Sequence, residues 1–217
     1  MTSIAVGLLQ LLSACGTSSG SSSSLPVVHA SGNEETIVLI RHGEIATGGL
    51  GQLSCKGFDR SLLLPQVFAR KFGTPDAIFA PNPSVQVHEG PAKAGYSYVR
   101  PLATIEPTAI RLGLPVNTQY GYSDVAALQT AVTSSAYAKS TVFIAWEHGY
   151  AHRFAKNLLT AYGVDPSVVP TWAESDFDMI YVFHIEPPAA GGSGAGQLTF
   201  EVEHEGLNES LESACAD

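Results

Sequence analysis

The sequence predicts an α/β protein, a three-layer α/β/α sandwich around a mostly parallel central sheet. Short apolar runs alternate along the chain with longer amphipathic stretches, which is the pattern of strands connected by helices. Most of the amphipathic stretches are bounded by the Ser, Gly or Pro residues that start and stop helices. The chain has 217 residues, of which 45% are hydrophobic, and this is enough for one sizeable core.

The first strand and the first helix are expected near the start of the folded domain. The run ETIVLI, residues 35–40, is typical of a buried strand. Residues 53–73 are expected to form a helix, with Ser54 as its N-cap and Gly73 as its stop. Pro65 lies inside this segment, so we expect it to kink the helix or to mark a late start.

A second strand and a second helix follow. Residues 75–83 contain a short strand, and residues 100–115 have a helical pattern. Pro101 suits the first turn of that helix, because a backbone N–H would have no helical partner there. Pro107 is expected to kink the same helix.

The second half of the chain repeats the alternation. A helix is expected over 123–140, then a strongly buried strand, TVFIAW, over 141–146, and then an amphipathic helix over 150–163. Two late strands, 178–186 and 197–205, are separated by a turn-rich segment. They are expected to form a hairpin at the edge of the sheet.

The charge of the chain limits its partners. The formal net charge is −9, and only 14% of the residues are charged. Neither a nucleic acid nor an anionic membrane surface is therefore expected as a partner. Any anionic substrate has to be held by a local cluster of cations against the field of the whole protein.

The residues before the first strand are not expected to belong to the fold. Residues 1–14 have the short apolar run of a signal peptide, which is too short to span a membrane. Leu12–Cys15 resembles the lipobox of bacterial lipoproteins, which implies cleavage before Cys15 and lipidation of its thiol. Residues 15–33 then form a Gly- and Ser-rich tether, and the domain spans 34–217. We expect an exported protein of the bacterial cell envelope with a lipid anchor to the membrane; an ordinary cleaved signal is the alternative.

Export also decides how the two remaining cysteines are interpreted. Cys55 lies near the start of the fold and Cys215 near its end. In an oxidising compartment, two such cysteines are expected to form a disulfide rather than to act as catalytic groups.

Two of the predicted strands are followed by the same pair of residues, a histidine and a glycine. The first is followed by Arg41, His42 and Gly43 in the motif IRHGE, and the later one by His148 and Gly149 in WEHGY. Because ligands gather at the carboxyl ends of parallel strands, both imidazoles are expected at one edge of the sheet. Each glycine is expected to let the backbone turn tightly beside a bound group.

The motif LIRHGE resembles the signature of the histidine phosphatase superfamily, the group of phosphoglycerate mutases and many phosphatases. The segments LSCKGFDRSLLLP, IFAPNPS followed by YVRPLATIEPTA, and VFIAWEHG resemble three further segments of that family, so the resemblance covers about residues 36–183. It departs from the family in residues 85–99, an insertion before Arg100 in which His88 is a candidate to line the mouth of a site. The resemblance implies a phosphoglycerate mutase-like fold.

The residues themselves suit phosphoryl transfer, which needs a nucleophile in line and cations on the equatorial oxygens. A neutral imidazole is a competent nucleophile, and His42 can form a phosphohistidine. Arg41 and Arg100 can hold the phosphoryl oxygens with planar, charge-assisted forks, and His148 can donate a further contact. The resemblance implies the same four residues as the catalytic and substrate-binding set.

The proton donor for the leaving group has three candidates. In the family it is a carboxylate after the second arginine, and the corresponding stretch YGYSDVAAL contains Asp124. Asp124 and Ser123 are also placed to cap the helix that follows. Glu106 and Glu147 are the alternatives, although Glu147 is expected to point to the other face of its strand. Arg60 is expected on the surface of its helix rather than on a phosphate.

The sequence contains no HExxH motif, no paired CxxC motif and no carboxylate cluster at metal spacing, so neither a metal nor another cofactor is expected. We therefore expect a metal-independent hydrolase of a small-molecule phosphomonoester that acts through a phosphohistidine on His42. A hydrolase is favoured over a mutase, because mutases of this family act on glycolytic intermediates in the cytoplasm and this chain is expected to leave it. The alternative is a catalytically weak lipoprotein of the same fold that binds phosphate or a phosphosugar.

Overall fold

The computed structural model describes residues 34–188, 196–208 and 211. The strands of the main sheet are β1 (Glu35–Arg41), β4 (Ala77–Phe79), β7 (Val116–Asn117), β8 (Thr141–Trp146), β9 (Met179–Glu186) and β10 (Gln197–His204). The helices are α1 (Cys55–Lys71), α2 (Arg100–Leu112), α3 (Val125–Val132) and α4 (His148–Ala161), with a 3₁₀ turn at Pro166–Val168. Two small hairpins are formed by β2 (Ile45–Ala46) with β3 (Gly49–Leu53) and by β5 (Gln86–Glu89) with β6 (Ala94–Ser97).

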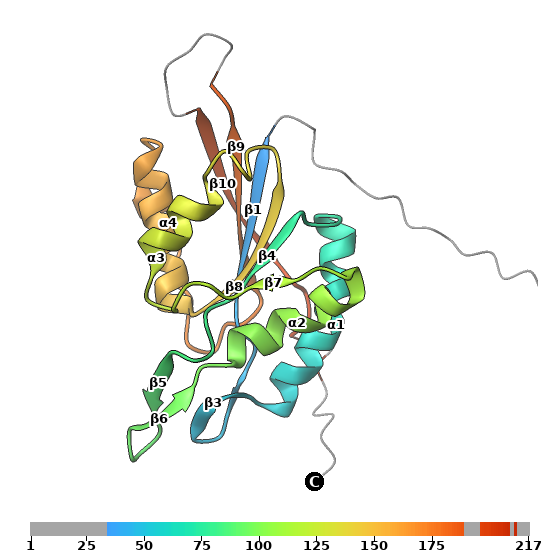
Figure 1. Ribbon diagram of the computed structural model, residues 1–217, viewed down its shortest axis with the longest axis vertical. Helices are drawn as coiled ribbons and strands as arrows, with labels where there is room; N and C mark the ends of the chain where they lie inside the picture. The colour runs from blue at the N-terminus through green and yellow to red at the C-terminus, as the bar shows by residue number, and fades with distance from the viewer. Residues whose placement is uncertain (1–33, 189–195, 209–210, 212–217) are drawn as a thin grey trace, which may run out of the picture.

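The main sheet has the strand order β10-β9-β1-β8-β4-β7 (Figure 1). β1, β8, β4 and β7 pair in parallel, whereas β9 is antiparallel to both of its neighbours, β1 and β10. The sheet is therefore mostly parallel. The predicted α/β class is confirmed, and so is the late hairpin at the edge of the sheet.

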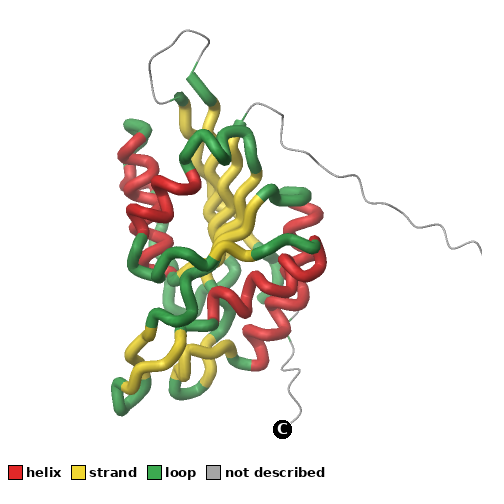
Figure 2. Tube along the Cα trace, viewed as in Figure 1, coloured by secondary structure: helices red, strands yellow, loops and turns green. Residues whose placement is uncertain are grey.

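Helices cover both faces of the sheet, as Figure 2 shows. Leu39 and Ile144 belong to the core cluster on the side of α3 and α4, and Val38 and Phe143 to the cluster on the side of α1 and α2. Neighbouring residues of one strand enter different clusters because successive side chains point to opposite faces. β1 is buried along its whole length, since it lies between β9 and β8 and under helices on both sides. These are the three layers that the sequence predicts.

α1 begins well before Pro65, at which one of the two predictions placed a late start. It starts at Cys55, with Ser54 as its N-cap, and it continues through Pro65 to its end. The late start at the proline is wrong. Leu64 and Val67 on either side of the proline are buried in the core, so packing of this face outweighs the loss of one helical hydrogen bond.

α3 is shorter than predicted and has a different cap. It ends at Val132, and its N-cap is Asp124 rather than Ser123, without a side-chain capping bond. The residues that follow Val132 form turns that lead into β8. The apolar pattern of this helix is therefore confined to its first two turns.

The two small hairpins are absent from the sequence prediction. β2–β3 follows the end of β1, and β5–β6 lies within residues 85–99, the insertion before α2. β3 contacts both β5 and β6, and the two hairpins lie side by side at one end of the molecule (Figure 1). They extend the molecule beyond the carboxyl end of β1.

Some of the sequence predictions fall outside the described residues. These are the signal peptide over 1–14, the tether over 15–33 with Cys15, and the partner of Cys55, namely Cys215. The anchor and the disulfide therefore stay predictions. Within the described ranges, no helix has the length and hydrophobicity needed to cross a bilayer.

Candidate active site

The loop after β1 is held by two neighbouring elements. His42 donates its backbone N–H to the carbonyl of Trp146 at the end of β8, at 3.0 Å. The N–H of Gly43 donates to Oγ1 of Thr104 on α2 at 2.9 Å, and that hydroxyl donates in turn to the carbonyl of Arg100 at 2.8 Å. The ends of β1 and β8 and the start of α2 therefore meet at one edge of the sheet, where the sequence places the site.

The glycine after His42 serves close packing. Neither Gly43 nor Gly149 has a positive φ, so neither position needs the left-handed backbone that glycine adopts readily. A Cβ on Gly43 would lie 3.0 Å from the carbonyl oxygen of Gly57 on α1, and a Cβ on Gly57 would lie 2.5 Å from the carbonyl oxygen of Glu44. The absence of both side chains lets α1 approach the loop that carries the nucleophile candidate.

His42 is buried, with 2% of its surface exposed. Its Nδ1 lies 2.8 Å from the carbonyl oxygen of Gly43, and because a carbonyl only accepts, Nδ1 carries the proton and Nε2 keeps its lone pair. Burial lowers the pKa of His42 to about 3, and the positive charges of Arg100 and Arg41 act in the same direction. The imidazole is therefore neutral at pH 7, which is the state that a nucleophile requires.

Arg41, the last residue of β1, is oriented by a loop that precedes β9. Its Nη1 donates to the carbonyls of Ala173 at 3.0 Å, Glu174 at 2.9 Å and Asp176 at 2.7 Å. Its Cζ lies 3.9 Å from the centroid of the Phe177 ring. The Nε of Arg41 is buried and has no hydrogen-bond partner among the described residues. The loop thus fixes the guanidinium through Nη1 and leaves the Nε side of the group for another acceptor.

Arg100, the first residue of α2, is fixed by a carboxylate. Its Nη1 and Nη2 donate to the two oxygens of Glu89 at 2.8 and 2.9 Å. Its Cζ lies 4.9 Å from the centroid of the Tyr98 ring. The Nε of Arg100, like that of Arg41, is buried and finds no hydrogen-bond partner in the described part of the chain.

His148, the first residue of α4, remains partly exposed and pairs with its neighbour in the sequence. Its Nδ1 lies 2.7 Å from Oε1 of Glu147, whose carboxylate also accepts the N–H of Tyr150 at 2.8 Å. The expectation that Glu147 points to the far face is wrong, because β8 ends at Trp146 and Glu147 is the N-cap of α4. Burial opposes the ionisation of Glu147, but these contacts outweigh it and lower its pKa to about 2.

Aromatic rings extend from His42 toward the start of α4. The Tyr98 ring lies 6.0 Å from the imidazole, the Tyr122 ring 5.2 Å from Tyr98, and the Tyr150 ring 5.5 Å from Tyr122, between ring centroids. The guanidinium of Arg153 lies 5.0 Å from the centroid of Tyr150. The half-buried rings of Tyr122 and Tyr150 offer an apolar wall against which the rest of a substrate can pack.

Two of the three proton-donor candidates, Asp124 and Glu106, lie outside this group. Asp124 is exposed, and its Oδ2 accepts the N–H of Gly121 at 3.0 Å, which closes the turn before α3. Asp124 shares its loop with Tyr122, whose ring contacts Tyr98 beside the nucleophile candidate. Glu106 lies farther along α2 and is half-buried. Of the predicted residues, the structure gathers four at the sheet edge and leaves Asp124 at their margin; the four are Arg41, His42, Arg100 and His148.

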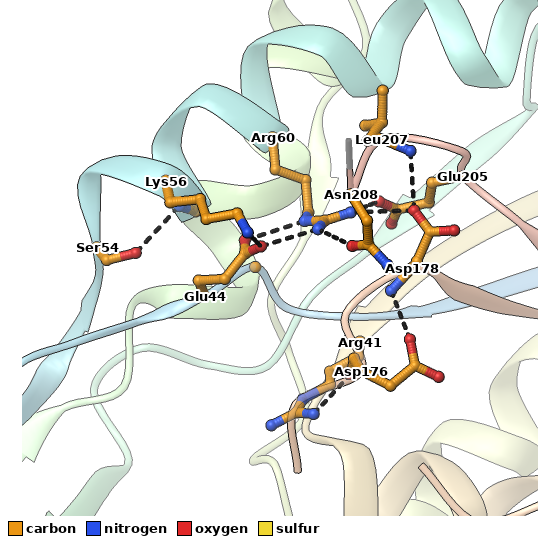
Figure 3. Close-up of polar contacts among 12 residues, drawn as sticks. Arg41, Glu44, Ser54, Lys56, Arg60, Asp176, Asp178, Glu205, Leu207 and Asn208 are labelled. Carbon is orange, nitrogen blue, oxygen red and sulfur yellow. Dashed lines mark hydrogen bonds and ion pairs between the residues drawn. The ribbon is translucent and has the colours of Figure 1, made fainter. Parts of the chain in front are cut away.

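Arg60 is buried, and the prediction that it lies on the surface is wrong. Its guanidinium donates to the two oxygens of Glu44 at 3.0 and 2.8 Å, to Glu205, and to Asn208 at 2.8 Å, with Asp178 at 3.5 Å (Figure 3). The acidic residues of this cluster compensate the buried cation. Glu44 directly follows the IRHG motif, and Glu205 follows β10. The cluster therefore ties the loop that carries His42 to the end of the described chain.

The sequence analysis did not single out two groups that shape this site. One is Glu89, although it is the only carboxylate in residues 85–99 and that fact could have drawn attention to it. The other is the set of backbone carbonyls that hold Arg41, for which a sequence carries no signal. Across the part of the chain that the structure describes, no group of three or more His, Cys, Asp or Glu side chains is arranged to hold a metal ion.

Comparison with known proteins finds a likeness of fold. No protein-family model and no curated protein matches the sequence. Among solved structures, mycobacterial hydrolase 2 matches with a TM-score of 0.52 and 11% identity, over 78% of this chain and 90% of that chain. The protein histidine phosphatase SixA, in complex with tungstate, matches with a TM-score of 0.50 and 14% identity, over 78% and 97% of the two chains. A mycobacterial glucosyl-3-phosphoglycerate phosphatase matches with a TM-score of 0.50 and 12% identity, over 77% and 97%.

These structural neighbours include members of the histidine phosphatase superfamily. The chain therefore has the phosphoglycerate mutase-like fold that its motifs predict. At identities this low, the likeness is one of fold.

Proposed function

We propose that this chain, which has the fold of the histidine phosphatases, is a phosphomonoester hydrolase that works through a phosphohistidine on His42. One observation carries the proposal. Two buried N–H groups, Nε of Arg41 and Nε of Arg100, have no hydrogen-bond partner among the described residues. The positive charges of both arginines also lower the pKa of His42 and so help to keep it neutral. Buried donors without a partner are rare and costly. A phosphoryl group held beside Nε2 of His42 is an anion that can accept from both.

The nucleophile is prepared by its hydrogen bond to the backbone. Because Nδ1 donates to the carbonyl of Gly43, the lone pair of His42 is on Nε2. The same bond stabilises the positive charge that develops on the ring as Nε2 attacks. Burial keeps the ring neutral, so His42 does not have to lose a proton before it attacks.

The reaction has two steps. In the first, Nε2 of His42 forms a bond to phosphorus while the bond from phosphorus to the leaving oxygen breaks. In the second, a water molecule attacks phosphorus and passes a proton to the carboxylate that gave one to the leaving oxygen in the first step, the bond to nitrogen breaks, and inorganic phosphate leaves. Arg41 and Arg100 contact the nonbridging oxygens in both steps, and His148 adds a contact from the start of α4. The two guanidinium cations hold an anion in a protein whose net charge is −9.

The leaving oxygen needs a proton, and Asp124 is the proposed donor. Two other carboxylates, Glu89 and Glu147, interact electrostatically with His42. However, hydrogen bonds to Arg100 lower the pKa of Glu89, and the pKa of Glu147 is about 2. Both are therefore held in the ionised form by their partners, whereas the carboxylate of Asp124 has a backbone N–H, that of Gly121, as its hydrogen-bond partner among the described residues.

Asp124→Asn is expected to slow the hydrolysis of an alkyl phosphate by roughly 10²-fold or more, which is the usual scale of general acid catalysis. The same change should scarcely affect p-nitrophenyl phosphate, because its leaving group needs little protonation. Steady-state kinetics with both substrates check this. Equal slowing of the two substrates, or no slowing of either, contradicts the role of Asp124.

A second candidate function is phosphate or phosphosugar binding with weak turnover. It is favoured by the ionised state of Glu89 and Glu147, since a site without a nearby acid retains its anion contacts but expels an alkoxide slowly. Such a protein binds inorganic phosphate and leaves alkyl phosphates intact. The hydrolase releases phosphate from both p-nitrophenyl phosphate and alkyl phosphates in the presence of a chelator.

The covalent intermediate is tested by trapping. We expect wild-type protein to acquire an acid-labile, base-stable phosphate from substrate, and His42→Ala to acquire none and to lose turnover. His152→Ala, on the first turns of α4, is the control and should label like the wild type. Circular dichroism checks that the variants fold. Equal labelling of all three proteins contradicts the assignment of His42.

A further inference from the structure

We infer that Glu89 is a positioning residue for Arg100, supplied by the β5–β6 hairpin. The inference rests on the proposed function, because it assumes that Arg100 holds the phosphoryl group. Glu89 is the last residue of β5, and its two oxygens accept Nη1 and Nη2 of Arg100 at 2.8 and 2.9 Å. A planar carboxylate paired in this way with a planar guanidinium restricts the guanidinium to one orientation.

Glu89 and a phosphoryl group can bind Arg100 at the same time. Glu89 takes the end of the guanidinium, where its oxygens face the two terminal nitrogens, and Nη1 also lies 3.4 Å from the carbonyl oxygen of Gly49. The side edge of the guanidinium, with Nε and the second N–H of Nη2, is a separate bidentate face. Its Nε is buried, and no described residue accepts a hydrogen bond from it. The orientation that Glu89 imposes therefore decides where this second face points.

The contacts of Glu89 differ from those expected of a carboxylate that occupies the phosphoryl site in place of a substrate. A substitute for a phosphoryl group would be expected to reach both arginines. Within the described residues, the hydrogen bonds of Glu89 go to Arg100 and to the backbone N–H of Gly51, whereas those of Arg41 go to the loop before β9. Glu89 thus approaches Arg100 from the side of the hairpins.

The first residues of β3 surround this carboxylate. Gly51 donates its N–H to Glu89, and a Cβ on Gly49 would lie 2.5 Å from Cδ of Glu89. Gly49 has a φ of +83°, and the preceding Gly48 has a φ of +80° with open space where its Cβ would be. The two positions therefore have the same left-handed backbone, but only Gly49 makes room for Glu89.

The charge of Glu89 alone would weaken the binding of an anion. Its hydrogen bonds to Arg100 lower its pKa, so it is ionised, and it interacts electrostatically with His42. Repulsion between Glu89 and a phosphate opposes binding. The benefit of Glu89 must then come from orienting Arg100, since a misplaced contact costs catalysis heavily. Orientation and charge can be perturbed separately in this protein.

Three variants make that separation. Glu89→Gln keeps the shape of the side chain but removes its charge and one acceptor. Gly49→Ala keeps the charge and displaces the carboxylate. Gly48→Ala is the matched control, because it adds a methyl group at the same kind of φ without touching Glu89. Isothermal titration with inorganic phosphate gives the affinity of each variant, and p-nitrophenyl phosphate gives kcat and KM.

We expect Glu89→Gln and Gly49→Ala each to weaken phosphate binding by roughly tenfold or more relative to Gly48→Ala, the loss typical of one charge-assisted contact. Their kcat should fall as well as their KM rise, because Arg100 contacts the phosphoryl group in the transition state too. A residue with a merely structural role would not move the phosphate affinity of a folded variant.

Two results would overturn the inference. Tighter phosphate binding by Glu89→Gln would mean that the carboxylate only repels or displaces the anion, and binding by Gly49→Ala equal to that of Gly48→Ala would mean that its position is immaterial. Both results leave the proposed function standing as long as the wild type hydrolyses its substrate. If the wild type binds no phosphate, the proposed function fails and the inference falls with it.

Discussion

His42 uses its two ring nitrogens for different purposes. Nδ1 is committed to the carbonyl of Gly43, and Nε2 is left with the lone pair that the proposed reaction needs. The ring is also packed against aromatic neighbours, with the centroids of Tyr98 and Phe177 at 6.0 and 6.4 Å. Such packing fixes the ring and excludes water, which prepares the nucleophile before a substrate arrives.

Burial of a neutral His42 makes the stability of the protein depend on pH. Its pKa is about 3 in the folded protein against 6.5 for an ordinary histidine. Between these values the unfolded chain binds a proton that the folded protein does not, so the contribution of His42 is present above pH 6.5 and is lost as the pH falls. Relative to His42→Gln, the free energy of unfolding of the wild type should decline by up to about 1.4 kcal/mol per pH unit below that point.

Urea unfolding of both proteins, at neutral pH and at two acidic values, measures this decline. Two buried carboxylates act in the opposite direction, because burial raises the pKa of Glu35 and of Glu205 to about 8, and their contribution is lost as the pH rises through that value. They are present in both proteins, so the difference between the two proteins isolates His42. A difference that does not change with pH contradicts the prediction.

α2 is joined to the loop of His42 through one hydroxyl. Thr104 is fully buried, accepts the N–H of Gly43 and donates to the carbonyl of Arg100. Thr104→Val keeps the shape of the side chain and leaves a buried N–H without a partner. We expect a loss of about 1–3 kcal/mol in the free energy of unfolding, together with a lower kcat.

Thr108, one turn farther along α2, supplies the matched control. It is also buried, but its hydroxyl has no hydrogen-bond partner in the structure. Thr108→Val should therefore be neutral or stabilising, because it removes an unsatisfied polar atom. Denaturant unfolding of both variants compares them. Equal losses in the two variants would mean that the bond to Gly43 contributes nothing specific.

α1 contributes a buried cation, Arg60, that supports the site, and removing this cation should strongly destabilise the protein. Arg60→Met leaves the ionised Glu44 without the cation that compensates it, and it removes the hydrogen-bond donor of Glu205, which is fully enclosed. Removing one partner of a buried ion pair costs about 3–5 kcal/mol. We expect a loss of this size in the free energy of unfolding.

Lys71 on the same helix is the contrasting case. It pairs with Glu203 at 2.7 Å, but both side chains are partly exposed, at 34% and 39%. Lys71→Met should therefore cost less than about 1 kcal/mol. Thermal or urea unfolding of the two variants tests the difference. A similar cost for both would mean that the Arg60 cluster is not the support inferred for the loop after β1.

The whole molecule is expected to be held at a membrane by its N-terminal segment, which lies outside the described residues. If Cys15 carries a lipid, wild-type protein should partition into a detergent phase and Cys15→Ala should remain in the aqueous phase, because the acyl chains supply the membrane affinity. Expression in a bacterial host followed by detergent phase separation measures this. Wild-type protein in the aqueous phase removes the anchor and leaves the proposed hydrolase untouched.

Local patterns were sufficient for most of the fold. The strands β1 and β8 and the helices α1 and α4 follow from runs whose period and bounding residues are visible in a few consecutive positions. The continuation of α1 through Pro65 was decided by packing, because a buried face can outweigh a local preference. The hairpins were missed since their strands are short and carry little apolar alternation.

The same division holds for the site. Arg41, His42 and His148 could be placed from the sequence alone, because each lies at the end or just beyond the end of a buried strand and strand ends meet at one edge. Which groups face them was a matter of tertiary structure: Glu89 reaches Arg100 from a hairpin, and Arg60 turns inward to Glu44 and Glu205. These pairings join residues on different elements, and their formation depends on how helices and loops pack, which no local pattern encodes.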